Sequence, residues 1–354
     1  MKSQRVSRAI CYFGSYDPDY SRNRIIKKGL EANGIKVLED QADGLVFSRY
    51  IKLLVTFLKI QKQVETIIIG FPGHYDIFLA FLLGKLFRKK VYYDIFASTY
   101  ETYVIDRKVI PKNSMNSKFY YLLDWVGLKL ADYVIIDTIA HGKFYKSLYG
   151  LDLKKTILVY VGSDSDYFYP RNLKETTDVL FYGSYQPLQG TDVIIKAAAI
   201  LPKINFKMIG EGQERQFAEN LAKNLKLKNV DFVNWLSLEK LSEEIAKAKV
   251  CLGIFSKSQK ANVVIPNKVF DSIASKKAVI TSNNSAMQEM NNLAGNQIAL
   301  VKPNNPLNLS KQINVLINDS DVRNMYATNG YSLYKSFFTP KVIVRELCLG
   351  IKHE

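Results

Sequence analysis

The sequence predicts an α/β fold of two domains, each built around a parallel sheet that helices cover. Short β-branched runs alternate with longer segments of helical periodicity through both halves of the chain, and this alternation is typical of parallel sheets. The chain has 354 residues, which is long for one hydrophobic core and suits two. Hydrophobic residues make up 47% and charged residues 23%, so the composition excludes a disordered chain.

In the first half, each predicted strand is followed by a predicted helix. Ser21 is expected to cap the first helix, and Gly34 suits the left-handed position after its end. In the segment 49–63 the apolar residues recur every three or four positions, which is helical spacing. The predicted strands are 9–13, 37–39, 66–69, 90–94, 133–137 and 157–160, and the predicted helices are 21–33, 49–63, 74–87 and 117–130.

The segment 161–170 breaks this alternation with Gly, Ser, Asp and Pro, and it is interpreted as the start of a linker between the domains. The alternation resumes near Asp178 and continues to about Ile317, and the tail is expected to be helical after Pro340. The predicted domains are 1–168, 169–330 and a C-terminal helix in 331–354.

The formal net charge is +16 and is divided evenly between the two halves. Such a field favours nucleotide phosphates or anionic lipid headgroups, although solvated lysine faces explain it equally well. Nucleic acid is not expected as a partner, because the basic residues are not interleaved with aromatic residues in a known module.

The three cysteines are scattered, and Cys11 and Cys251 lie in apolar strand-like runs. This placement favours buried thiols over disulfides or a metal site. The longest apolar stretch, 67–87, contains Pro72 and Asp76 and is not expected to span a membrane. We therefore expect a cytoplasmic protein.

Two strand–loop–helix junctions, 183–190 and 266–268, are rich in Gly or marked by Pro. Unpaired backbone N–H groups and the helix dipole converge at such junctions and favour phosphate. The sequence therefore predicts a ligand that carries a diphosphate.

The order of three blocks, V-L-F-Y-G-S-Y-Q-P-L-Q-G, F-K-M-I-G-E-G and V-V-I-P-N-K-V-F-D, resembles the C-terminal half of retaining glycosyltransferases of family 4, the glycosyl transferases group 1. The resemblance implies a GT-B fold, in which two Rossmann-like domains face each other across a cleft and the last helix crosses back to the first domain. It also implies transfer of a hexosyl group from a nucleotide-sugar donor to a glycan or lipid-linked acceptor, with no other cofactor and no metal ion.

By this resemblance, Asp271 takes the place of a carboxylate that binds the ribose hydroxyls of the donor. Lys268 lies one helical turn earlier and would neutralise phosphate; a surface Lys–Asp pair is the structural alternative. Glu289 is either a ligand of the donor sugar or a surface carboxylate. The full predicted donor-binding set is Gly14, Gly183, Ser184, Gln189, Gly190, Glu211, Lys260, Asn267, Lys268, Asp271 and Glu289.

The sequence departs from the usual family pattern at three positions. Val263 replaces a second carboxylate, and Ser184 and Gln189 stand where the family often has Arg and Lys. Nearby lysines, including Lys260, would substitute for the missing charges. These departures keep open a catalytically silent partner subunit, and a nucleotide-sugar epimerase of similar architecture is a third alternative.

Asp94, at the end of a predicted strand, is the first candidate to accept a hydrogen bond from the acceptor hydroxyl, and His74 is the second. Either side chain could instead be structural. His141 is interpreted as a helix-start residue. Two Asp-x-Asp pairs, at 17–19 and 164–166, lie in turns where Asp is expected for capping. Lysines beside apolar helix faces suggest a loose association with an anionic membrane surface.

Overall fold

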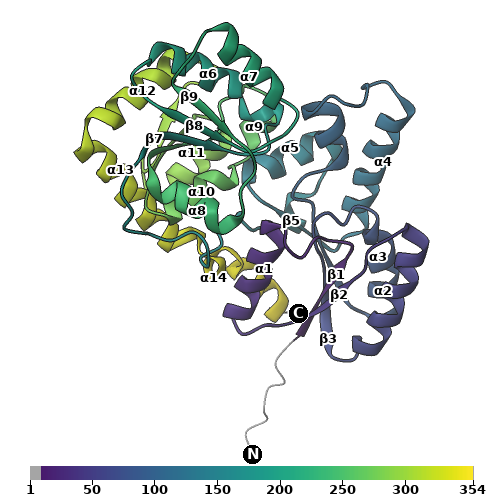
Figure 1. The fold of residues 1–354 in the computed structure, drawn as a ribbon. Coiled ribbons are helices and arrows are strands. Elements are labelled where there is room, and N and C mark those ends of the chain that lie inside the picture. The colour runs from purple at the N-terminus through teal and green to yellow at the C-terminus, as the bar shows by residue number, and fades with distance from the viewer. Residues whose placement is uncertain (1–8, 354) are drawn as a thin grey trace, which may run out of the picture. The chain divides into compact units, whose positions relative to one another are not determined.

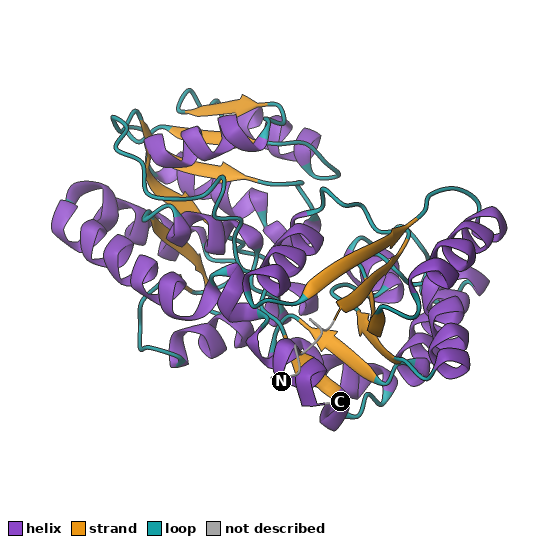
Figure 2. Ribbon diagram, turned by 90° about the horizontal axis from the view of Figure 1, so that it is seen from below, coloured by secondary structure: helices purple, strands orange, loops and turns teal. Residues whose placement is uncertain are grey.

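The computed structural model describes residues 9–353 and divides them into two compact units. Unit 1 comprises residues 9–160 and 340–353, and unit 2 comprises residues 161–339 (Figure 1). Each unit contains one six-stranded parallel sheet with helices packed around it (Figure 2). The predicted α/β class with two parallel sheets is confirmed.

The sheet of unit 1 has the strand order β2-β1-β3-β4-β5-β6, with all neighbouring pairs parallel. Its strands are β1 (Ala9–Gly14), β2 (Lys36–Gln41), β3 (Val64–Ile69), β4 (Lys90–Asp94), β5 (Tyr133–Ile136) and β6 (Thr156–Leu158). Its α-helices are α1 (Ser21–Ala32), α2 (Val46–Ile60), α3 (Asp76–Phe87), α4 (Met115–Leu130), α5 (Ile139–Tyr149), α14 (Pro340–Ile343) and α15 (Arg345–His353). A π-helical turn, η1, spans Glu101–Asp106.

The central strand β1 is apolar along its whole length because helices cover both faces of the sheet. Every residue of β1 is buried, whereas the edge strand β2 is mostly part-exposed, as expected for a parallel sheet between helix layers. Gly34 adopts the expected left-handed conformation, with φ of 78°. The expectation that Ser21 caps α1 is wrong: Ser21 is the first helical residue, and the cap position is Tyr20, without a side-chain bond.

Only the start of helix α5 was anticipated from the sequence, at His141, and its extent to Tyr149 was not. Gly142 within it weakens the helical pattern, but a Cβ at this position would lie 2.7 Å from Cδ1 of Ile136. The glycine therefore lets α5 pack closely on the sheet, and tertiary packing overrides its low helix propensity.

The sheet of unit 2 has the order β12-β11-β10-β7-β8-β9, again with parallel neighbours. Its strands are β7 (Thr177–Tyr182), β8 (Phe206–Ile209), β9 (Val230–Val233), β10 (Ala248–Leu252), β11 (Ala278–Ser282) and β12 (Ala299–Val301). Its α-helices are α6 (Thr191–Ile200), α7 (Arg215–Asn224), α8 (Leu238–Lys247), α9 (Gln259–Val263), α10 (Asn267–Ala274), α11 (Ser285–Asn292), α12 (Pro306–Asn318) and α13 (Ser320–Leu333). Short helical turns η3 (Pro187–Gln189) and η4 (Tyr334–Phe338) complete it.

The C-terminal helices α14 and α15 are part of unit 1 and pack against α1 and β6. A Cβ at Gly29 would lie 2.2 Å from the carbonyl oxygen of Pro340, so α1 needs glycine where α14 crosses it. The side chain of Asn33 donates a hydrogen bond of 2.8 Å to the carbonyl of Lys341.

The three cysteines are buried free thiols, as expected for two of them. Within residues 9–353, no helix has the length and apolar character needed to cross a membrane.

Candidate functional site

The loop after β7 brings three of the predicted donor-binding residues together. A Cβ at Gly183 would lie 2.7 Å from Nζ of Lys268 and 2.8 Å from Oε1 of Gln189. The backbone of Gly183, the amine of Lys268 and the amide of Gln189 therefore meet at the carboxyl end of β7. Ligands of open α/β sheets bind at this end of the strands.

A second strand-exit loop packs directly on the first. A Cβ at Gly210 would lie 1.9 Å from the carbonyl oxygen of Gly183, and one at Gly212 would lie 1.8 Å from that of Ser184. Both glycines also have positive φ, of 122° and 142°. Only glycine fits these two positions. Glu211, between them, is exposed.

A third loop, after β10, closes the other side of this arrangement. Gly190 has a φ of 62°, and a Cβ there would lie 2.6 Å from the backbone nitrogen of Ser256. The backbone N–H of Phe255 donates a hydrogen bond of 3.0 Å to the carbonyl of Gln189. Gly190 precedes α6, so these contacts fix the loop that leads into the N-terminus of that helix.

Lys268 holds a buried ammonium group without a hydrogen-bond partner. Its side chain is almost fully buried, and Nζ lies 4.1 Å from the centroid of the Phe181 ring. Among residues 9–353, neither Nζ of Lys268 nor Oε1 of Gln189 finds a hydrogen-bond partner. Burial lowers the pKa of Lys268 to about 7, although nearby Asp271 acts to raise it. Unsatisfied buried polar groups are costly and mark candidate ligand sites.

The carboxylate of Asp271 forms hydrogen bonds with side chains other than that of Lys268. Its Oδ1 accepts a hydrogen bond of 2.6 Å from Oγ of Ser163, and its Oδ2 lies 3.3 Å from the hydroxyl of Tyr182. Asp271 is also buried. The alternative of a surface Lys–Asp pair is therefore wrong, since both side chains are inside unit 2.

The remaining donor-side candidates lie on neighbouring helices. Lys260 is buried on α9, while Asn267, the first residue of α10, and Glu289, on α11, are half-buried. The side chain of Asn284 donates a hydrogen bond of 2.7 Å to the carbonyl of Ala261, which ties α11 to α9.

In unit 1, Gly14 lies in a rigid loop at the end of β1. Its φ is 123°, and a Cβ there would lie 3.0 Å from Oδ2 of Asp76. The same Oδ2 accepts hydrogen bonds from the backbone N–H and the hydroxyl of Ser15, at 2.8 and 2.7 Å. Oδ1 of Asp76 pairs with Arg49 at 2.9 Å. Asp76 therefore fixes the loop from its position at the start of α3.

His74 follows β3 and is also embedded in polar contacts. Its Nδ1 lies 2.9 Å from the hydroxyl of Tyr93 and 3.7 Å from Oδ1 of Asp124. The side chain is 9% exposed, so it is mostly buried within unit 1.

Asp94, the last residue of β4, lies in a buried ion pair. Its side chain is fully buried and pairs with Arg22 through two contacts, Nε to Oδ2 at 2.9 Å and Nη2 to Oδ1 at 3.0 Å. Arg22 is equally buried and also donates to the carbonyl of Val159 at 2.6 Å. Because the carboxylate neutralises a buried guanidinium, this pairing supports the structural alternative for Asp94, and its contact with the acceptor stays a prediction.

A buried charge cluster in unit 1 was not found from the sequence. Nε2 of His141 lies 3.1 Å from both carboxylate oxygens of Glu101, and its Nδ1 lies 2.6 Å from Oδ1 of Asp137. The hydroxyl of Tyr145 donates to Glu101 at 2.9 Å. Although burial lowers the pKa of His141, the two carboxylates outweigh it and raise the pKa to about 10. His141 does lie at the start of α5, as expected.

The sequence indicates only one of the two carboxylate contacts of His141. Asp137 and His141 are four residues apart at a helix start, a spacing that can bring two side chains together. Glu101, in contrast, lies 40 residues from His141 and belongs to the π-helical turn η1. Nothing in its local sequence indicates this contact.

Both Asp-x-Asp pairs are turns, as expected. Oδ1 of Asp17 accepts from the backbone N–H of Asp19 at 2.8 Å, and Oδ1 of Asp164 accepts from that of Asp166 at 3.2 Å. In the described part of the chain, no group of three or more His, Cys, Asp or Glu side chains is arranged to hold a metal ion.

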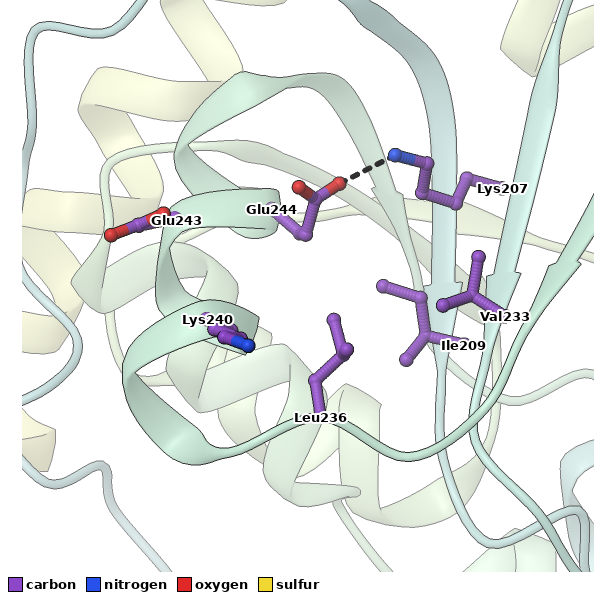
Figure 3. Close-up of a pocket in the computed structure, with 7 residues that line it drawn as sticks. All are labelled: Lys207, Ile209, Val233, Leu236, Lys240, Glu243 and Glu244. Carbon is purple, nitrogen blue, oxygen red and sulfur yellow. Dashed lines mark hydrogen bonds and ion pairs between the residues drawn. The ribbon is translucent and has the colours of Figure 1, made fainter.

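A pocket of about 290 Å³ lies elsewhere in unit 2, between α8 and the strands β8 and β9 (Figure 3). Two of the charged residues that line it form an ion pair, since Nζ of Lys207 points toward Oε2 of Glu244 and lies 2.7 Å from it. Its other wall is apolar, with Ile209, Val233 and Leu236. None of the predicted site residues lines it, so it is not the candidate site.

Part of the chain matches a known protein family. Residues 165–333 match the model of the family described as glycosyl transferases group 1. The matched region lies within unit 2. It contains the Lys268 site and every donor-side candidate except Gly14. The match gives no support to the silent subunit or the epimerase.

One curated relative is an uncharacterized glycosyltransferase of Methanocaldococcus jannaschii, 25% identical over 237 residues. The alignment covers 67% of this chain and 63% of that relative, so the chain spans less than two thirds of that relative's length.

Solved structures share the fold over almost the whole chain. HepE of Anabaena, in complex with UDP and glucose, has a TM-score of 0.71 at 14% identity, covering 98% of this chain and 100% of its own. Sucrose-phosphate synthase of Thermosynechococcus elongatus has a TM-score of 0.73 at 17% identity, covering 98% of both chains. The predicted GT-B fold class is confirmed.

Proposed function

We propose that this protein is a retaining glycosyltransferase that moves a hexosyl group from a nucleotide-sugar donor to a glycan or lipid-linked acceptor. The observation that carries the proposal is the buried, unpartnered ammonium group of Lys268, which lies beside Gly183 and Gln189 at a strand exit of the group 1 domain. A diphosphate would be the anionic partner of this ammonium group.

In the proposed reaction, the donor diphosphate lies over Gly183 and meets the amine of Lys268. The bond between the sugar and the diphosphate breaks, and negative charge develops on the leaving phosphate oxygen. A cation held in a site with little water stabilises that charge most strongly in the transition state. The loop that leads into α6 adds backbone N–H groups on the same side.

The rest of the donor is assigned to the surrounding loops. Asp271 is the proposed ligand of the ribose hydroxyls, because Ser163 and Tyr182 hold its carboxylate in place three residues after Lys268 on α10. Glu289 is the proposed ligand of the donor sugar. The loop residues Ser184, Gln189 and Glu211 would complete the site.

The reaction is proposed to need no metal ion and no cofactor besides the donor. Lys268 provides a positive charge at the diphosphate, which is the role that a divalent cation plays in other transferases. Turnover that EDTA abolishes and magnesium restores would contradict this part of the proposal.

On the acceptor side, the burial of Asp94 leaves His74 as the candidate to contact the acceptor hydroxyl. Its Nδ1 lies 2.9 Å from the hydroxyl of Tyr93, and the side chain keeps a small exposed fraction, 9%. His74→Gln should lower kcat and leave the affinity for the donor unchanged, because unit 2 holds the donor. The proposed location is the cytoplasm, with a peripheral place at the inner face of the membrane.

The decisive experiment measures donor binding. Thermal-shift screening against UDP-, GDP- and CMP-sugars should identify one nucleotide, and calorimetry should then give its affinity. Lys268→Met should weaken that affinity by roughly 1–3 kcal/mol, the range for a hydrogen bond to a charged group. The matched control is Lys196→Met, which removes an exposed lysine paired with Asp192. If no nucleotide sugar binds, or if both variants bind like the wild type, the proposal is wrong.

A further inference from the structure

We propose that the outer face of α2 and α3 docks on an anionic lipid bilayer, and that the pocket at the end of α3 receives the phosphate group of a lipid. This proposal goes beyond the transferase reaction and does not depend on it. It assigns the membrane contact to particular side chains of unit 1.

The first observation is an unusual exposure of apolar side chains. Helix α2 has 15 residues, but only Arg49, Leu53 and Phe57 are buried. Phe47 is 80% exposed, and Leu86 of α3 is 74% exposed. The large apolar side chains exposed on or next to these two helices are Leu45, Val46, Phe47, Ile51, Leu54, Val55, Leu58, Leu82 and Leu86. Scattered exposed apolar residues are ordinary, whereas a concentration of this kind marks an interaction site.

The second observation is that the two helices form one surface. The rings of Phe57 and Phe87 lie 5.6 Å apart, which joins α2 to the last turn of α3. At the other end, the hydroxyl of Tyr50 donates to the backbone carbonyl of Tyr75, just before α3. The helices run beside each other along one side of the unit 1 sheet (Figure 1).

The third observation is the sign of the charges on this face. Lys52, Lys59 and Lys85 are exposed on the two helices. The only carboxylate within either helix is Asp76, which is buried and paired with Arg49. The exposed charges within the two helices are therefore all positive and lie beside apolar side chains, which is the pattern of helices that lie on anionic membranes.

The fourth observation is a basic pocket at the carboxyl end of α3. It has a volume of about 260 Å³, and its lining residues are Phe81, Gly84, Lys85, Arg88, Lys89, Lys90, Val91 and Asp132. Lys90 lies 3.6 Å from Asp132 and is partly neutralised. The charges of Lys85, Arg88 and Lys89 remain in excess. The exposed Leu82 and Leu86 follow the lining residues Phe81 and Lys85 in the sequence of α3, so the same helix would present both a phosphate site and apolar side chains to the bilayer.

Charge also argues against the other occupants of an apolar face. A symmetric dimer through this face would bring the same lysines of two copies together, and like charges repel. Nucleic acid would match the charge but not the exposed leucines and Phe47. An anionic bilayer matches both.

The test is co-sedimentation of the full chain with vesicles. We expect binding to vesicles of phosphatidylcholine with phosphatidylglycerol at low salt, and little binding to phosphatidylcholine alone. Lys85→Glu/Arg88→Glu should weaken binding by at least roughly 30-fold, since each basic residue at an anionic surface contributes about fivefold. Leu82→Ser/Leu86→Ser should weaken binding while the charge is unchanged.

Two matched controls separate this surface from total charge and apolarity. Lys203→Glu/Lys223→Glu changes the net charge equally at exposed lysines of unit 2, and Leu225→Ser/Leu307→Ser removes exposed leucines there. Both controls should bind like the wild type. Equal binding to neutral and anionic vesicles, equal losses in test and control variants, or a dimer that Leu82→Ser/Leu86→Ser dissociates would overturn the proposal. Circular dichroism and light scattering of each variant establish that it is folded.

Discussion

The carboxylate of Asp271 bonds to Ser163 and lies next to Tyr182, and it does not bind the ammonium group of Lys268 three residues earlier on α10. The lysine is left against the face of the Phe181 ring, 4.1 Å from its centroid. Such a contact attracts a cation but replaces little of its lost hydration. The desolvation cost of burying Lys268 is therefore offset only in part within the protein, and the proposed diphosphate would offset the rest.

The affinity for a nucleotide sugar should depend on the protonation of Lys268. Its pKa is about 7 in the empty site, and a bound diphosphate would raise it, so binding takes up a proton. Affinity for the nucleotide sugar that the screen identifies should fall by up to about tenfold per pH unit above pH 7, because the neutral amine must be protonated first. Calorimetry from pH 6 to pH 9 measures this slope, and Lys268→Met should remove it. An equal slope in that variant would assign the proton to another group.

Two glycine substitutions at neighbouring strand exits should affect different properties, donor binding in one variant and stability in the other. Gly183→Ala places a methyl group against the flexible ends of Lys268 and Gln189, so the protein should fold normally but bind donor at least about tenfold more weakly, through the displaced charge. Gly210→Ala meets a backbone carbonyl and requires an unfavourable φ, so it should cost roughly 1–3 kcal/mol of stability. Urea unfolding and calorimetry on both variants distinguish the two. A stable Gly210→Ala protein would contradict the packing described.

Asp94→Asn should affect stability more than catalysis. Removing one charge of a buried ion pair leaves Arg22 uncompensated, and such losses cost about 3–5 kcal/mol. Asp192→Asn, in the exposed pair with Lys196, should cost at most about 1 kcal/mol. Denaturant titration of both variants measures the difference. If Asp94→Asn is as stable as Asp192→Asn and has a lower kcat, a catalytic role for Asp94 is restored.

The cluster around His141 should make unit 1 less stable as the pH rises. The pKa of His141 is raised to about 10 in the folded state, against about 6.5 when unfolded. The stabilisation is therefore complete below pH 6.5 and is lost progressively up to pH 10. Unfolding of the wild type and of His141→Gln at pH 6, 8 and 10 should show a difference that shrinks with pH. A constant difference would indicate that His141 is neutral in the fold.

Local sequence was sufficient where a residue's role depends on its own strand or helix. The strand Lys90–Asp94 and the left-handed Gly34 were predicted at their observed positions, because apolar β-rich runs and glycine after a helix carry their own signal. The grouping of Lys268 with the glycine loop was also anticipated, since both follow strands of one parallel sheet, whose carboxyl ends meet at one edge.

Residues whose role depends on a distant partner were not predicted. Asp94 has the sequence signature of a strand-end carboxylate in a ligand site, and that signature does not indicate its buried ion pair with Arg22, 72 residues away. The contact of Phe181 with Lys268 was likewise hidden, because every position at the end of β7 is apolar and buried. Side-chain pairing across a sheet edge is set by topology, which local patterns do not contain.

The position of α14 and α15 has a consequence for the order of folding during synthesis. The first 160 residues leave the ribosome long before the segment that packs on α1, where Gly29 has no side chain and Pro340 crosses. Unit 1 therefore lacks the helices that pack on α1 until all of unit 2 has been translated. Unit 2 is one continuous segment and can fold as soon as it has been synthesised. A nascent chain released before Pro340 would hold a finished second unit and an unfinished first one.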